Sequence, residues 1–175
     1  MSKELDLRAY IREFPDWPKE GILFRDITPV LLHPRAFTAA VDALCSEFRA
    51  SEIDFVGAIE ARGFIFGASV AERLEAGFVP IRKKGKLPGK TKSITYNLEY
   101  GTDTLQVHSD AIDHGSKVLM VDDLLATGGT MHSACRLIEK IGGRIAGISF
   151  LIELNYLRGR EKLSDYKVNS VIAYD

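Results

Sequence analysis

Apolar residues follow two different spacings, and segments with one spacing alternate along the chain with segments that have the other. Short runs of apolar and β-branched residues predict strands at 54–60, 78–82, 117–121, 144–154 and 167–173. Between several of these runs, apolar residues recur every three or four positions and predict helices at 35–49, 62–74 and 130–141. This alternation predicts an α/β fold, with a mostly parallel central sheet flanked by helices.

Three further segments stand outside this alternation. Residues 93–100 and 104–108 are β-rich and flank Gly101, Thr102 and Asp103, which predicts an antiparallel hairpin added to the sheet. Near the N-terminus, residues 6–13 have a short helical pattern that ends before Pro15. Residues 156–163 predict one more short helix.

Length and composition narrow the class of protein. The 175 residues fit a single domain over 1–175, and 46% hydrophobic with 27% charged residues excludes a disordered chain. A net charge of −1 argues against a uniformly basic nucleic-acid binder. No apolar window is long enough to span a membrane, and the charged start lacks the pattern of a secretory signal. We therefore expect a cytoplasmic protein that binds neither nucleic acid nor membranes.

The segment VLMVDDLLATGGT, residues 118–130, carries the most chemical information. An apolar strand ends in Asp122 and Asp123, and a glycine-rich loop then leads into a helix. Free backbone N–H groups at such a helix start bind phosphate, and glycines let the backbone approach closely. Two carboxylates beside a phosphate can accept hydrogen bonds from a sugar diol or hold a divalent cation. The string predicts a ribose 5-phosphate site; the alternative is a surface Asp-Asp turn before an ordinary helix cap.

We expect two properties of this segment from its position. Carboxylates at the end of a strand should be exposed before a ligand binds. Gly129 should need a backbone conformation that a β-branched residue tolerates poorly.

Two other segments offer positive charge or free N–H groups. Residues 82–92, RKKGKLPGKTK, contain six basic residues and no acidic one, so they predict a flexible basic loop. Its GKLPGKT portion has one residue too few between its glycines for a nucleotide P-loop. Residues 60–63, EARG, end one strand and open a helix. Each segment has a plain alternative, a solvated charged face or an ordinary helix start.

Together these segments resemble the type I phosphoribosyltransferases. The segments GILFRDITPVL, EARGFIFG, IRKKGKLPGKT, LEYG and ELNYLRGREKL are similar to the branch of that family that uses adenine, and the resemblance covers nearly the whole chain. It implies transfer of the 5-phosphoribosyl group from phosphoribosyl pyrophosphate to adenine, giving AMP and pyrophosphate. It also implies a homodimer, an N-terminal hood at about 1–33, and a flexible catalytic loop and hairpin at about 82–108.

The resemblance implies the following roles for individual residues. The 5-phosphate contacts Ala126, Thr127, Gly128, Gly129 and Thr130, and the ribose contacts Asp122 and Asp123. The pyrophosphate contacts Glu60, Ala61, Arg62, Arg82 and Lys86, with a cis peptide between Glu60 and Ala61. The adenine lies among Leu23, Phe24, Arg25 and Leu157. Glu99 is the catalytic carboxylate and Tyr100 helps to close the loop. Mg²⁺ is implied as the cofactor, held mainly by substrate oxygens rather than by protein ligands.

Some alternatives stay open from the residues alone. Glu99 is also explained as a surface residue of a strand, and the segment 23–26 as a core-docking segment with an ion pair. The activity could serve another purine. A non-catalytic regulator that senses phosphoribosyl pyrophosphate and binds nucleic acid is a further alternative, although the net charge and the short N-terminal segment leave little room for a DNA-binding unit.

Overall fold

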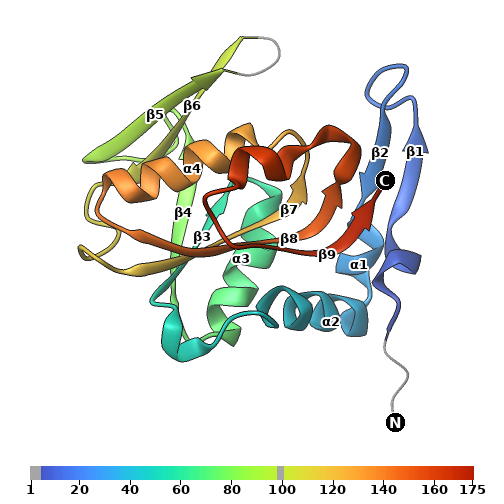
Figure 1. The fold of residues 1–175 in the computed structure, drawn as a ribbon, viewed down its shortest axis with the longest axis horizontal. Helices are drawn as coiled ribbons and strands as arrows, with labels where there is room; N and C mark the ends of the chain where they lie inside the picture. The colour runs from blue at the N-terminus through green and yellow to red at the C-terminus, as the bar shows by residue number, and fades with distance from the viewer. Residues whose placement is uncertain (1–4, 98–100) are drawn as a thin grey trace.

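The main sheet of the computed structural model has a mostly parallel arrangement (Figure 1). The structure describes residues 5–97 and 101–175. Within them, the sheet has the strand order β5-β6-β4-β3-β7-β8-β9. Its strands are β3 (Phe55–Ile59), β4 (Gly77–Lys83), β5 (Thr91–Asn97), β6 (Thr102–His108), β7 (Lys117–Leu125), β8 (Arg144–Leu154) and β9 (Val168–Tyr174). Parallel pairing joins five neighbouring strands, in the order β4, β3, β7, β8 and β9. Strand β6 pairs antiparallel with both β4 and β5. The predicted α/β fold is confirmed.

Helices cover both faces of this sheet. In Figure 1, α2 (Pro34–Cys45) and α3 (Arg62–Arg73) lie on one face and α4 (Gly129–Lys140) lies on the other. Side chains of β7 alternate between the two layers, as the period of a strand requires. Leu119 and Val121 pack with α2 and α3, while Val118 and Met120 pack with α4. Burial on both faces explains why the sequence of β7 is almost entirely apolar.

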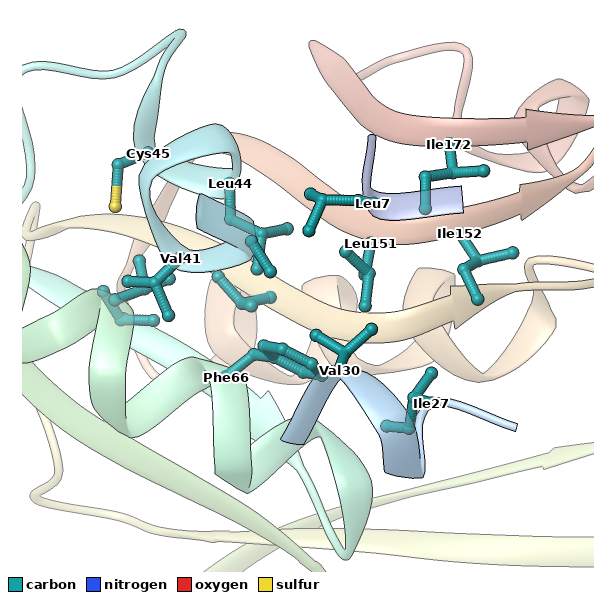
Figure 2. Packing of buried hydrophobic residues seen from close by; sticks show 14 of the residues in the cluster. Leu7, Ile27, Val30, Val41, Leu44, Cys45, Phe66, Leu151, Ile152 and Ile172 are labelled. Atoms are coloured by element: carbon teal, nitrogen blue, oxygen red, sulfur yellow. The ribbon is translucent and has the colours of Figure 1, made fainter. Parts of the chain in front are cut away.

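Figure 2 shows the core beneath α2 and α3. Leu44 of α2, Phe66 of α3 and Leu151 of β8 are fully buried there. Val30 of the short helix α1 (Thr28–Leu32) and Leu7 near the N-terminus join the same cluster. Burying each large apolar side chain contributes roughly 1.5–3 kcal/mol, so this cluster fixes the N-terminal segment to the domain.

The N-terminal segment differs from its prediction. In place of a helix over 6–13, a short 3₁₀ helix η1 (Leu7–Tyr10) leads into β1 (Arg12–Pro15), which pairs antiparallel with β2 (Leu23–Asp26). Asp26 joins the two strands, because its Oδ2 accepts hydrogen bonds from Arg12 Nε at 3.0 Å and Nη2 at 2.6 Å. Its Oδ1 accepts from the Thr28 backbone N–H at 2.9 Å. Strand pairing and this carboxylate override the weak helical pattern.

The basic loop and the hairpin are more regular than predicted. The end of β4 reaches Lys83 and β5 begins at Thr91, so regular strands occupy both ends of the segment 82–92. Thr102 and Asp103 are strand residues rather than turn residues, since they pair with Asn97 and Tyr96. Figure 1 shows the β5–β6 hairpin and the β1–β2 hairpin at opposite ends of the molecule, both extending toward the top of the view.

Three short 3₁₀ helices complete the described part of the chain. They are η2 (Ala50–Glu52), η3 (Asn155–Leu157) and η4 (Gly159–Leu163). The single helix predicted over 156–163 is therefore interrupted, because Arg158 adopts a left-handed conformation with φ 53°. None of the helices in the described ranges is both long enough and apolar enough to cross a membrane.

Candidate active site

A cavity of about 470 Å³ lies where the carboxyl ends of β3 and β7 meet. Its walls come from three segments: the end of β3 with the start of α3, the end of β7, and the loop before α4. They contribute Ile59 to Arg62, Asp122 to Leu125, and Ala126 to Met131, together with Lys83 and Phe150. Parallel strands that lie side by side end at the same edge of the sheet, which is where open α/β sheets bind ligands. The predicted phosphate loop, the acidic pair and three of the predicted pyrophosphate residues therefore share one cavity.

The loop before α4 presents free backbone donors to this cavity. α4 begins at Gly129, and Gly128 before it has φ 77° and supplies no side-chain cap. The first N–H groups of the helix have no partner within the helix, so they are available to an anion. Contrary to expectation, Gly129 needs no left-handed conformation, because the positive φ belongs to Gly128. A Cβ atom on Gly128 would lie 2.4 Å from the carbonyl oxygen of Gly159.

Gly159 is a structural partner of this loop that sequence reasoning did not identify. A Cβ atom there would lie 2.1 Å from the carbonyl oxygen of Ala126, so η4 packs directly against the loop. Arg160 anchors η4 to β8, since its Nε and Nη2 bond the two carboxylate oxygens of Glu153 at 2.9 and 2.5 Å. The motif ELNYLRGREKL contains Gly159 and was the only signal in the sequence for its role. The motif alone does not indicate that this segment contacts the loop at Ala126.

Asp123 is buried and Asp122 is partly buried, which corrects the expectation that both carboxylates are exposed before a ligand binds. Asp123 is 5% exposed and forms an ion pair with Arg62, with Asp123 Oδ2 2.6 Å from Arg62 Nε. The first turn of α3 covers Asp122, because a Cβ atom on Gly63 would lie 2.8 Å from Asp122 Oδ1. That oxygen accepts the backbone N–H of Asp123 at 2.9 Å. Burial, and then the neighbouring charge of Asp123, raise the pKa of Asp122 well above its ordinary value.

Glu60 organises the basic residues rather than facing an anion. Its Oε2 accepts hydrogen bonds from Arg82 Nε at 3.0 Å and Nη2 at 2.9 Å, and its Oε1 accepts the backbone N–H of Lys83 at 2.6 Å. Partial burial raises the pKa of Glu60, but the bonds from Lys83 and Arg82 outweigh it and hold that pKa below the ordinary value. Arg82 also donates from Nη1 to the carbonyl of Lys86 at 3.0 Å. The peptide between Glu60 and Ala61 is cis.

Lys83 lines the cavity, whereas the predicted Arg82 and Lys86 do not. Its Nζ lies 3.2 Å from Asp103 Oδ2, so it connects the cavity wall to the β5–β6 hairpin. The sequence offered adjacent lysines at 83 and 84 with no means of choosing between them. Lys83 is the last residue of β4, and the strand places its side chain at the cavity wall.

The residues predicted to surround adenine lie outside the lining of this cavity. Leu23 and Leu157 are exposed apolar side chains, and Phe24 packs edge-on against Trp17 with ring centroids 4.4 Å apart. Arg62 connects Phe24 to the cavity, since its Cζ lies 5.8 Å from the Phe24 ring centroid.

The Arg25 side chain is directed away from the cavity. It pairs with Glu13 and lies over the ring of Tyr174, with its Cζ 3.7 Å from the ring centroid. Its backbone is therefore the part that remains for a ligand. Two further predicted residues, Glu99 and Tyr100, lie outside the described residues.

The oxygen donors of the cavity suit a magnesium ion that arrives with its substrate. Mg²⁺ prefers one or two carboxylates together with waters and phosphate oxygens. Asp122 and Asp123 provide such a pair. Over residues 5–97 and 101–175, no group of three or more His, Cys, Asp and Glu side chains is placed to hold a metal. The residues present fit an ion that is coordinated mainly by substrate.

Comparison with known proteins connects this cavity to a family. The phosphoribosyl transferase domain model matches residues 30–174. The adenine phosphoribosyltransferase of Pseudothermotoga lettingae is 55% identical over 170 residues, which is 97% of this chain and 100% of that protein. The crystal structure of adenine phosphoribosyltransferase from Thermoanaerobacter pseudethanolicus matches with a TM-score of 0.92 and 50% identity, covering 96% of this chain and 98% of that one.

A second solved structure extends the match to a liganded enzyme. The adenine phosphoribosyltransferase of Saccharomyces cerevisiae, complexed with an imino-altritol bisphosphate and adenine, matches with a TM-score of 0.90 and 38% identity. The match covers 94% of this chain and 96% of the yeast chain. On the domain match and this identity over nearly the full length, the chain belongs to the adenine phosphoribosyltransferase family.

Proposed function

We propose that this protein transfers the 5-phosphoribosyl group from phosphoribosyl pyrophosphate to adenine, releasing AMP and pyrophosphate. The observation that carries the proposal is the single cavity that brings together the phosphate loop, the carboxylate pair and Arg62. The yeast relative, complexed with adenine and a bisphosphate of a sugar-like ring, supports the same pair of substrate chemistries.

The 5-phosphate and ribose fit the end of the cavity nearest α4. We assign the 5-phosphate to the N–H groups of Ala126 to Thr130, with the hydroxyls of Thr127 and Thr130 as further donors. The ribose hydroxyls then face Asp122 and Asp123. For the diol to reach Asp123, the ion pair between Arg62 and Asp123 must open, and this frees a guanidinium beside the pyrophosphate.

The pyrophosphate fits the opposite end, where Arg62 and Lys83 line the cavity. Negative charge grows on this group as the bond to the ribose C1 breaks, so cations placed in advance lower the barrier. Bound Mg²⁺ supplies the same charge neutralisation. Glu60 holds Arg82 and the backbone of Lys83 in position for this step.

The purine proton needs a general base or acid, and we assign that role to Glu99. Adenine fits between the cavity and the hood residues Phe24 and Arg25, where backbone groups can read its 6-amino edge. A 6-oxopurine reverses the donor and acceptor at that edge, so it would leave buried polar groups unpaired. We assign loop closure over the bound substrates to Tyr100.

The direct test is incubation of the protein with labelled adenine, phosphoribosyl pyrophosphate and Mg²⁺. We expect labelled AMP and pyrophosphate in equal amounts, and little product when hypoxanthine or guanine replaces adenine. Preference for a 6-oxopurine would reassign the base. Absence of product, combined with a DNA gel shift that responds to phosphoribosyl pyrophosphate, would favour the regulator instead. The implied homodimer and cytoplasmic location belong to the same proposal and are tested by light scattering and cell fractionation.

A further inference from the structure

Lys162 stands beside the phosphate loop although the loop motif does not include it. Its Nζ lies 3.9 Å from the position that a Cβ atom on Gly129 would take, at the first residue of α4. The backbone of Lys162 is fixed on both sides, because Gly159 packs on the loop and Leu163 is fully buried. The packing of η4 therefore fixes the Lys162 backbone beside the start of α4, and its exposed side chain extends toward Gly129.

The other charged residues of η4 have opposite charges as partners. Arg160 bonds Glu153, and Glu161 pairs with Arg158 at 3.7 Å. Lys162 makes no ion pair or hydrogen bond within the described part of the chain. Both charged neighbours of Lys162 in η4 thus have an ion-pair partner, whereas Lys162, the lysine beside the phosphate loop, has none among the described residues.

The position of Lys162 is electrostatically unfavourable without an anion. The start of a helix carries partial positive charge, which attracts anions and repels cations. α4 has no acidic residue in its first turn and no side-chain cap, so nothing in that turn offsets the ammonium. A dianionic phosphate between the two would satisfy the free N–H groups and the ammonium together.

We infer that Lys162 is a further 5-phosphate-binding residue, contributed by η4 to the loop at the start of α4. This inference rests on the proposed function and adds to it a specific contact. The ligand group is the monoester phosphate shared by AMP and by phosphoribosyl pyrophosphate. Lys162 supplies a full positive charge where the loop supplies only backbone and hydroxyl dipoles.

The test compares ligands with and without the phosphate. Titration calorimetry would measure AMP and adenosine binding to the wild type, Lys162→Gln and Lys162→Arg. We expect Lys162→Gln to bind AMP about fivefold more weakly, because exposed charged contacts contribute modestly. Adenosine affinity should not change, and Lys162→Arg should bind AMP nearly as the wild type does. The difference should shrink at high ionic strength, since salt screens an exposed charge.

Lys167→Gln is the matched control, because the Lys167 ammonium pairs with the Glu47 carboxylate at 3.2 Å and donates to the Glu47 backbone carbonyl at 3.1 Å. It removes the same charge and should leave AMP affinity unchanged. Equal weakening of AMP and adenosine by Lys162→Gln, or no weakening of either, would overturn the inference. Failure of the wild type to bind AMP or make it from adenine would instead contradict the proposed function, so the two failures are distinguishable.

Discussion

Gly128→Ala is the sharpest test of how the phosphate loop is built. Gly128 has φ 77°, a region that costs an L-residue roughly 1–2 kcal/mol. The new methyl group would also lie 2.4 Å from the Gly159 carbonyl oxygen, so the loop or η4 must move apart. Overpacking of this kind costs roughly 1–3 kcal/mol. We therefore expect the free energy of unfolding to fall by about 2–5 kcal/mol, and AMP affinity to fall as the loop is displaced.

Gly129→Ala is the natural comparison, because it adds the same atom one residue later. Its Cβ would meet only Lys162 Nζ at 3.9 Å, which is ordinary contact, and its φ is not left-handed. Alanine also has a higher helix propensity than glycine. Urea unfolding and calorimetry with AMP should show a stable Gly129→Ala protein that still binds AMP. If Gly128→Ala matched it in both measurements, the close packing of the loop on η4 would be refuted.

Three further substitutions test the carboxylates. Asp122→Asn should raise the unfolding temperature at pH 7 and weaken the use of phosphoribosyl pyrophosphate. Folding raises the pKa of Asp122, so the free energy of unfolding of the wild type falls as the pH rises through that raised pKa. Lower stability of the variant than of the wild type at pH 7 would contradict this reasoning. Asp26→Asn should lower unfolding free energy by about 1 kcal/mol at pH 7. Burial raises the pKa of Asp26, but bonds from Thr28 and Arg12 lower it overall, so this stabilisation should disappear as pH falls through the lowered pKa, and an equal loss at acid pH would argue against it. Glu99→Gln should slow single-turnover AMP formation about 100-fold or more with little change in substrate affinity, and a wild-type rate would exclude the catalytic role.

The fold was predictable because its strands and helices have clear periods. The strand predicted over 144–154 coincides with β8, and the helix predicted over 130–141 is within one residue of α4 at each end. The N-terminal segment was not predictable in the same way. The pairing of β1 with β2 depends on contacts such as Arg12 with Asp26, and no local pattern signals a pairing between residues so far apart.

The site was predictable where its chemistry lies in one continuous segment. The run from Asp122 to Thr130 lines the cavity as a unit. The low exposure of Asp123 and the covering of Asp122 were not predictable, because they depend on α3 packing over the end of β7. The contribution of Gly159 was hidden for the same reason, since its contact with Ala126 forms only when η4 folds back onto the loop.

The two ends of the cavity that we propose to bind anions differ in whether their positively charged groups already have carboxylate partners. At the proposed pyrophosphate end, Arg62 pairs with the buried Asp123 and Lys83 pairs with the partly exposed Asp103, so carboxylates balance these cations before any ligand arrives. Pyrophosphate must therefore exchange one set of ion pairs for another. At the proposed 5-phosphate end, the first turn of α4 has no acidic residue, and Lys162 has no ion-pair partner among the described residues. A phosphate there would gain its contacts without displacing a partner, so under the proposed function we expect this end to anchor the ribose donor while the other end rearranges for pyrophosphate release.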